Sequence, residues 1–345
     1  METQVLDAFD IEKDSKNIDI AAKLLREGKT VIFPTETVYG LGANAFNEEA
    51  VKNIFKAKGR PSDNPLIVHI ADIEDIKPLV KSIPESLYTL AERFWPGPLT
   101  IILPKSENIP SVTSGGLDTV AIRMPENEIA REIIKRSGVP VAAPSANISG
   151  APSPTSFRHC RDDMMGRVDA IVNSYDSKVG VESTVLLLSD KPKILRPGGV
   201  TYEMLIDYLP ELEVDRGVLH IMADNEKASS PGMKYKHYAP NAECVLVNGT
   251  TDKFCSFVRE KQKEQDNIYA ICFDEDMEYI KKNAISYGKR DDHNTQAHKI
   301  FAILRETNEI DNIRKIYIHA PMMNDVGLAV YNRLIRSCAF NIVDL

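Results

Sequence analysis

The chain has few cysteines, and their positions suit neither a metal site nor a redox pair. The five cysteines are scattered through the 345 residues, without a C-x-x-C pair or a histidine at the spacing of a metal ligand. Zinc sites and disulfide frameworks need such clustering. We therefore expect reduced thiols, as in a cytoplasmic protein.

Long apolar runs and an excess of basic residues are also missing. No stretch approaches the about 18 consecutive apolar residues of a membrane span. The N-terminal sequence METQVLDAFDIEKD is acidic and lacks the pattern of a signal peptide. The formal net charge of −8 argues against indiscriminate nucleic-acid binding, although it leaves room for a local basic cleft. We expect a cytoplasmic protein that does not enter a membrane.

Well-known nucleotide and hydrolase motifs are missing or out of context. The chain has no G-x-x-x-x-G-K-[ST] P-loop, and Ser145 lacks the flanking glycines of G-x-S-x-G. The segment Gly40–Ala45 has the form G-x-G-x-x-A, but Pro-Thr-Glu-Thr separates it from the preceding strand and no acidic residue closes the next strand, about 20 residues on. We interpret its glycines as a tight turn or as room for close backbone approach to a ligand.

Hydrophobic periodicity predicts two α/β domains joined by an irregular linker. In the first domain, 1–216, we expect helices over 18–27, 48–58, 73–81, 84–94, 126–137 and 202–209, and strands over 30–33, 65–70, 99–103, 119–124, 139–143, 170–172, 183–188 and 193–196. Because strands and helices do not alternate strictly, a mixed sheet is expected. The linker is expected over 217–240. In the second domain, 241–345, strands over 244–247, 268–273 and 315–319 alternate with helices over 251–264, 293–307 and 325–336, which predicts a smaller parallel sheet.

Polar and conformationally special residues are concentrated between Phe33 and His69. Lys56, Lys58 and Arg60 stand at alternate positions where a helix ends. Two interpretations are open: a solvated helix end whose cations complement the dipole, or a cradle for a polyphosphate. His69 ends a strand, where a lone histidine is more often a core residue than a ligand-binding one.

Further polar groups follow later strands. Arg123 and Arg196 each end an apolar strand, and 144–147 and 182–184 contain serine, asparagine and glutamate. Arginines at such positions usually form ion pairs. Together with these serine, asparagine and glutamate residues, however, they resemble the few polar side chains that line an otherwise apolar ligand pocket. The aromatic and basic residues 235–238 in the linker predict either a lid that docks over this pocket or a simple tether.

Several longer sequence strings are specific for a protein family, whereas each of the short patterns above is not. They are FPTETVYGLG, KAKGRPSDNPLIVH, WPGPLT, TVAIRMP, APSANISG, VESTV, LRPG and PGMKYKHYAP. Together they resemble the Sua5/YrdC/YwlC family, in its long two-domain Sua5 form. The resemblance covers essentially the whole chain and is most specific up to Pro240.

The resemblance implies an enzyme that condenses L-threonine, bicarbonate or CO2, and ATP into L-threonylcarbamoyl-AMP and pyrophosphate. This product supplies the t6A modification of tRNA. The implied fold is a YrdC-like twisted mixed sheet with a positively charged cavity, followed by a Rossmann-like domain. Besides the three substrates, the implied partners are the threonylcarbamoyl transferase machinery and, weakly, tRNA. Mg2+ is implied as an ion held by the ATP phosphates.

The resemblance also assigns site residues, position by position. It implies that L-threonine is bound by Thr37, His69, Arg123 and Ser183. It implies that catalysis at the phosphates uses Lys56, Lys58 and Arg60, with Asn64. It implies that ATP is further bound by Thr119, Ala143, Ser145, Ser153 and Arg196, with Tyr235 closing over it. No side chain is implied as a metal ligand.

Two other functions share parts of this pattern. A double-stranded RNA-binding module without catalysis would also use a basic concavity. The acidic total charge and the small-ligand pattern of Thr37, Ser183 and Arg123 count against it. Carbamoyl transfer in hydrogenase maturation uses a related core domain, but it would normally bring acylphosphatase and zinc-finger segments, which are not recognised in this sequence.

Overall fold

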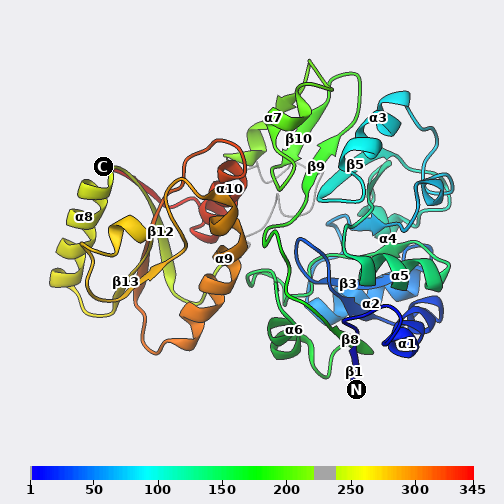
Figure 1. Cartoon of the computed structure of the whole chain (residues 1–345), viewed down its shortest axis with the longest axis horizontal. Helices are drawn as coiled ribbons and strands as arrows, with labels where there is room; N and C mark the ends of the chain where they lie inside the picture. Colours follow the sequence, from blue (N-terminus) through cyan, green and yellow to red (C-terminus); the bar gives the residue numbers. More distant parts are fainter. Residues whose placement is uncertain (1, 221–237) are drawn as a thin grey trace. The chain divides into compact units, whose positions relative to one another are not determined.

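The computed structural model describes residues 2–220 and 238–345, which divide into two compact units (Figure 1). The first unit contains 2–149 and 153–218, and the second contains 150–152, 219–220 and 238–345. Most of the segment expected to be the linker lies outside the described residues. None of the helices in these two ranges is long and apolar enough to cross a membrane.

The first unit is built on one mixed sheet, in which the described residues form 11 strands. In chain order they are β1 (Gln4–Asp7), β2 (Val31–Phe33), β3 (Gly40–Asn44), β4 (Ile67–His69), β5 (Leu99–Pro104), β6 (Thr119–Arg123), β7 (Val141–Ala142), β8 (Ala170–Asn173), β9 (Thr184–Leu187), β10 (Lys193–Arg196) and β11 (Glu213–Val214). Their spatial order is β1-β8-β2-β3-β7-β4-β6-β5-β9-β10-β11. Strand β6 is parallel to β4 but antiparallel to β5, so the predicted mixed sheet is confirmed.

Helices pack on both faces of this sheet. They are α1 (Ser15–Arg26), α2 (Glu48–Lys58), α3 (Glu85–Phe94), α4 (Ser111–Ser114), α5 (Glu128–Ser137), α6 (Phe157–Met164) and α7 (Tyr202–Leu205), with single turns η1 (Ile73–Ile76) and η2 (Arg216–Val218). Leu25 of α1 and Ile133 of α5 share a buried cluster with Phe33. Ile54 of α2 shares another with Val68. Successive strand residues point to opposite faces, so His69 points away from Val68, and its ring contacts Phe33 edge-on.

Helix α2 begins and ends as predicted. The Asn47 side chain accepts a hydrogen bond from the Ala50 N–H at 3.1 Å, which caps the first turn. Gly59 ends the helix with a φ of 61°, a left-handed conformation that glycine adopts without strain. These two caps fix the position of the basic segment that follows.

Two predictions of local structure in this unit are wrong. The helix predicted over 73–81 is the single turn η1, since Pro78 has no N–H to continue a helix. Of the two interpretations of the Gly40–Ala45 glycines, the tight turn is wrong, because Gly40–Asn44 is strand β3, between β2 and β7. Its glycine serves close packing: a Cβ at Gly42 would lie 2.6 Å from Phe33 Cε1 and 2.7 Å from Val141 Cγ1.

The second unit contains a parallel sheet of the predicted Rossmann-like kind. Its described strands are β12 (Glu243–Asn248), β13 (Ile268–Cys272), β14 (Ala284–Ser286), β15 (Lys315–His319) and β16 (Ile342–Asp344). Their order is β14-β13-β15-β12-β16, and every pair is parallel. The helices are α8 (Thr251–Glu264), α9 (His293–Glu306) and α10 (Gly327–Ser337), with turns η3 (Asp274–Asp276) and η4 (Thr307–Glu309). Figure 1 shows α8 on one side of β12 and β13 and helices α9 and α10 on the other.

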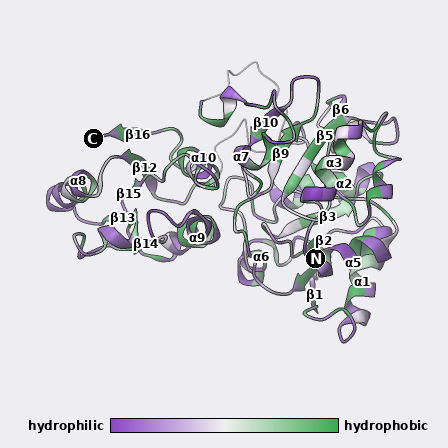
Figure 2. Cartoon of the chain, turned by 45° about the horizontal axis from the view of Figure 1, so that its top comes forward, coloured by the Kyte–Doolittle hydropathy of each residue, from purple (hydrophilic) through white to green (hydrophobic). Residues whose placement is uncertain are grey.

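Hydropathy follows this layering. In Figure 2 the hydrophobic colour gathers on central strands such as β5 and β6, and much of the surrounding loop surface is hydrophilic.

The sequence does not predict β14 and β16, because three residues are too few to show a period of two.

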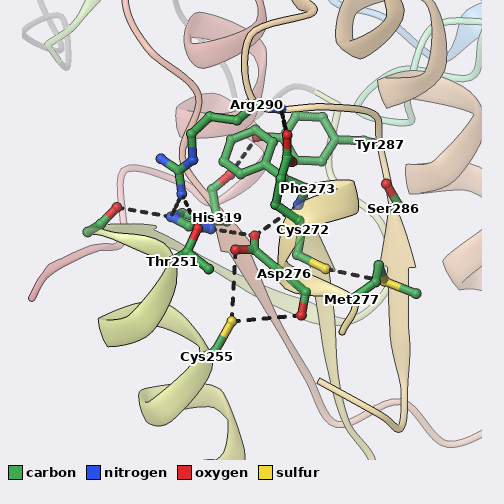
Figure 3. A network of polar contacts seen from close by, with 12 residues as sticks. Thr251, Cys255, Cys272, Phe273, Asp276, Met277, Ser286, Tyr287, Arg290 and His319 are labelled. Atoms are coloured by element: carbon green, nitrogen blue, oxygen red, sulfur yellow. Dashed lines mark hydrogen bonds and ion pairs between the residues drawn. The ribbon is translucent and has the colours of Figure 1, made fainter. Parts of the chain in front are cut away.

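Asp276 and His319 form a buried pair at the carboxyl end of the second sheet (Figure 3). His319 Nδ1 lies 2.6 Å from Asp276 Oδ2, and neither side chain is exposed. Phe254 stacks on the imidazole with ring centroids 4.1 Å apart, and Arg290 Nη2 lies 3.0 Å from His319 Nε2. Burial alone would raise the pKa of Asp276, but the hydrogen bond and charge of His319 lower it overall. The network ties the end of β15 to the segments that follow β13 and β14.

The cysteines are all buried thiols. Cys160 belongs to the first unit, whereas Cys244, Cys255, Cys272 and Cys338 belong to the second. Burial, followed by the charge of Asp276, raises the pKa of Cys255 to about 12. This thiol therefore remains protonated and unreactive at neutral pH.

Candidate active site

A row of polar side chains crosses neighbouring strands of the first sheet. His69 at the end of β4 pairs with Arg123 at the end of β6. Antiparallel β5 places Thr100 on the other side of Arg123. Ser183, directly before β9, continues the row, with its Oγ 2.8 Å from Thr100 Oγ1. Three residues assigned to L-threonine by resemblance therefore lie together.

Arg123 is the centre of this row and is only 3% exposed. Its Nη1 donates to Thr37 Oγ1 at 2.8 Å, and its Nε donates to the Gly97 carbonyl at 3.3 Å. Its Nη2 lies 2.7 Å from Glu36 Oε1 in an ion pair. The Thr-Glu-Thr turn and the Trp-Pro-Gly-Pro segment thus hold the guanidinium from two sides, and Thr37 joins the row.

The Thr35–Thr37 turn is fixed by its own side chains and by a distant loop. Thr35 Oγ1 lies 2.9 Å from Thr37 Oγ1. The Val179 N–H donates to the Glu36 carbonyl at 2.7 Å, and Ser177 Oγ donates to the Thr35 carbonyl at 3.0 Å. The backbone that carries Glu36 and Thr37 therefore has one defined conformation.

His69 is held in its neutral form. Burial, followed by the positive charge of Arg123, lowers its pKa to about 3. Its Nδ1 is buried and has no hydrogen-bond partner among the described residues. The imidazole can therefore donate or accept one hydrogen bond toward a ligand without adding charge.

Ser183 is positioned by Arg196 and by a close backbone contact. Arg196 Nε donates to the Ser183 carbonyl at 3.1 Å, and its Nη2 donates to Ser183 Oγ at 3.2 Å. A Cβ on Gly198 would lie 2.3 Å from the Thr184 nitrogen and 2.6 Å from the Glu182 carbonyl oxygen. The Leu-Arg-Pro-Gly string thus packs directly on the Val-Glu-Ser-Thr string.

Lys58 anchors a second group of polar residues. It is 2% exposed, and its Nζ donates to the carbonyl oxygens of Ser145 at 2.5 Å and Asn147 at 2.6 Å. Ser145 Oγ in turn donates to Asn147 Oδ1 at 2.5 Å. A buried cation therefore organises the Pro-Ser-Ala-Asn loop.

Asn64 and Thr119 lie at the start of the strands whose ends carry His69 and Arg123. Thr119 is the first residue of β6, and Asn64 lies three residues before β4. Because β4 and β6 are parallel, both residues lie toward the same end of the sheet. Asn64 is 1% exposed, and within the described residues neither amide atom has a hydrogen-bond partner.

Two further residues assigned by resemblance, Arg60 and Ala143, adjoin this end of the sheet, whereas Ser153 lies beside the row that contains Ser183. Arg60 Nη2 lies 3.5 Å from the Pro65 carbonyl. Ala143 donates its N–H to the Ile67 carbonyl at 2.8 Å. Ser153 is buried and donates to Glu182 Oε1 at 2.6 Å.

Lys56 and Tyr235 are not placed with these groups. Lys56 is exposed and borders a separate cavity of about 420 Å³ with Gly28 and Asp169. Residues two apart on a helix project to nearly opposite sides, so Lys56 points away from Lys58, and its expected place at the phosphates is not supported by the structure. Tyr235 lies outside the described residues.

Sequence reasoning missed the partners of the assigned residues. Glu36 pairs with Arg123, Thr100 contacts Ser183, and Glu182 accepts from Ser153. Each pair joins segments that are distant in sequence. The only sequence signal was that Glu36 and Glu182 stand inside strings already singled out.

Two family models match the chain. One, described as Telomere recombination and named for Sua5, YciO and YrdC, matches residues 23–198. The other, described as Threonylcarbamoyl-AMP synthase, C-terminal domain, matches residues 200–339. The chain belongs to the Sua5 family. The resemblance stated from the motifs is therefore confirmed.

Similar Sua5 proteins match over nearly their full length. The threonylcarbamoyl-AMP synthase of Pyrococcus abyssi is 45% identical, over 94% of this chain and 95% of that protein. The threonylcarbamoyl-AMP synthase of Bacillus subtilis is 43% identical, over 97% of this chain and 96% of that protein. The crystal structure of P. abyssi Sua5 complexed with L-threonine is similar with a TM-score of 0.90 and 43% identity, covering 99% of this chain and 100% of that one.

Proposed function

We propose that the chain synthesises threonylcarbamoyl-AMP from L-threonine, bicarbonate or CO2, and ATP, with release of pyrophosphate. The observation that carries the proposal is the placement of two polar groups at opposite ends of the same strands. His69 and Arg123 end β4 and β6, whereas Asn64 and Thr119 adjoin their starts. About four residues of strand, or about 13 Å, separate the ends. An amino acid and a nucleotide phosphate bound at the two ends would meet over the strands between them.

The end with Arg123 suits the amino acid. Its guanidinium matches a carboxylate, and Thr37 and Ser183 add hydroxyl groups within the same row. His69, neutral and buried, offers one more hydrogen bond without repelling an ammonium group. The L-threonine complex of the similar P. abyssi Sua5 supports this assignment.

The end with Lys58 suits the phosphates. Arg60 supplies a cation with bidentate geometry, and the amide of Asn64 supplies a donor and an acceptor that have no described partner. Lys58 holds Ser145 in place through its carbonyl. We expect ATP to enter as its Mg2+ complex, with the ion held by phosphate oxygens and water. The resemblance also assigns Ala143, Ser153 and Arg196 to ATP. Ala143 lies at this end, whereas Ser153 and Arg196 contact Glu182 and Ser183 beside the amino-acid row.

The chemistry then needs alignment rather than a side-chain nucleophile. The unprotonated amine of threonine adds to CO2, and a carboxylate oxygen of the resulting carbamate attacks the α-phosphorus. The bond from that phosphorus to the pyrophosphate oxygen breaks, which makes the enzyme a nucleotidyltransferase. Fixed cations near the leaving group stabilise its developing charge. The product would pass to the machinery that forms t6A in tRNA.

Pyrophosphate release by the purified full-length chain tests this function. We expect release that requires ATP, L-threonine and bicarbonate together, and that falls when any one is omitted. Arg60→Ala should lower turnover with ATP, since it removes charge at the phosphates. Binding of double-stranded RNA without threonine-dependent ATP consumption would refute the proposal.

A further inference from the structure

Glu36 lies in the candidate active site but has no part in the reaction as proposed above. Its side chain is 1% exposed, and Oε1 lies 2.7 Å from Arg123 Nη2. Within the described part of the chain neither carboxylate oxygen accepts a hydrogen bond of good geometry, because the N–H bonds of Nη2 are not directed at Oε1. An ionised carboxylate has room for about four donors. Glu36 is therefore a buried charge that is short of donors, which is costly unless a ligand supplies them.

The Glu36–Arg123 pair presents two opposite charges side by side in a buried place. A free α-amino acid carries the same two charges in the complementary order, an ammonium beside a carboxylate. We propose that the pair is the receptor for the amino-acid zwitterion, with the substrate carboxylate on Arg123 and its ammonium on Glu36. This proposal rests on the proposed function, which supplies the amino acid as substrate.

The surroundings of Glu36 favour contact between its carboxylate and the ammonium of the substrate. The Val179 N–H holds the Glu36 carbonyl at 2.7 Å, so the turn cannot easily move the carboxylate away. An ammonium brings three donors to a group that has none of good geometry among the described residues. His69 is buried beside Arg123 and contributes no competing positive charge.

The pair would also set the class of substrate. A molecule with a carboxylate but no ammonium would occupy Arg123 and leave Glu36 buried without a counter-charge. Such an unpaired charge weakens binding more than the loss of one neutral contact. The site should therefore prefer α-amino acids to the corresponding α-hydroxy acids.

Calorimetric titration of the full-length chain tests the proposal. The two probes are L-threonine and 2,3-dihydroxybutanoate, in which a hydroxyl group replaces the ammonium. Glu36→Gln keeps the shape but removes the charge, and it should weaken L-threonine binding roughly 10- to 100-fold. Binding of the hydroxy acid should become stronger, because Glu36→Gln removes the carboxylate charge that this acid leaves unpaired, and binding of ATP should change little. Glu36→Asp should recover part of the preference, and Glu132→Gln on α5 is the matched control outside the site, expected to leave both probes unaffected.

Several outcomes would overturn the proposal. Unchanged affinity of Glu36→Gln for L-threonine would do so, as would equal losses for L-threonine and the hydroxy acid, which indicate a structural role. If Glu36→Gln does not fold, the intact chain decides: equal affinity for the two probes rejects the zwitterion site. A chain that shows the Glu36-dependent preference but releases no pyrophosphate would reject the proposed function and leave this site standing.

Discussion

The ammonium of Lys58 lies 2.6 Å from the carbonyl oxygen of Asn147, a residue 89 positions further along the chain. Together with the contact to Ser145, this bond fixes a loop of the candidate phosphate site to the end of α2. A lysine buried in this way is part of the architecture as well as of the site.

Lys58→Met should therefore destabilise the first unit by about 2–4 kcal/mol, because buried carbonyl groups lose charge-assisted donors. Turnover should fall with it. Lys56→Met, on the exposed side of the same helix, should change neither quantity. Denaturant unfolding and pyrophosphate release measure the two effects, and equal effects of the two variants would contradict the separation seen here.

Asn64→Ala should separate activity from stability. The amide is buried without a hydrogen-bond partner in the described ranges, so its removal should change the free energy of unfolding by no more than about 1 kcal/mol. Turnover with ATP should fall roughly 10- to 100-fold if the amide binds a phosphate. A large loss of stability would show instead that Asn64 is a structural residue.

The buried His69 predicts a pH dependence of stability. Its pKa is lowered from 6.5 to about 3 in the folded chain, so between these pH values the unfolded chain binds the extra proton. The free energy of unfolding should therefore fall with decreasing pH in this window, by about 1.4 kcal/mol per pH unit for this group. His69→Gln should remove this contribution to the slope, which corresponds to the uptake of one proton on unfolding. Urea titrations at pH 7 and pH 5 measure the difference. An unchanged slope would mean that His69 is protonated in the folded state.

Gly198→Ala tests the contact between the Leu-Arg-Pro-Gly and Val-Glu-Ser-Thr strings. The added Cβ would meet backbone atoms of 182–184 at 2.3–2.6 Å, and the backbone cannot yield as a flexible side chain could. We expect a loss of about 1–3 kcal/mol or more and weaker threonine binding through displaced Ser183. Gly138→Ala, where a Cβ meets nothing within 4 Å but φ is +67°, should cost only about 1 kcal/mol. Similar melting temperatures for the two variants would rule out the close contact.

The sequence predicts the strands and helices with clear periodicity and the residues inside specific strings, but not their mutual contacts. The alternate spacing of Lys56 and Lys58 fits either one phosphate cradle or a solvated helix end. On a helix the same spacing separates them, and this could have been derived from the sequence alone. The contact of Glu36 with Arg123 could not have been derived from the sequence, because only the register of the sheet brings Arg123 to Glu36. Strand β14, three residues long, carries no period to detect.

The burial of every cysteine gives the protein a set of internal reporters. A thiol reagent reaches these sulfurs only when the surrounding structure opens. Because Cys160 lies in the first unit and the other four thiols lie in the second, the mass added during labelling would time the opening of each unit separately. A ligand that slows the labelling of Cys160 alone would reveal which unit it holds closed.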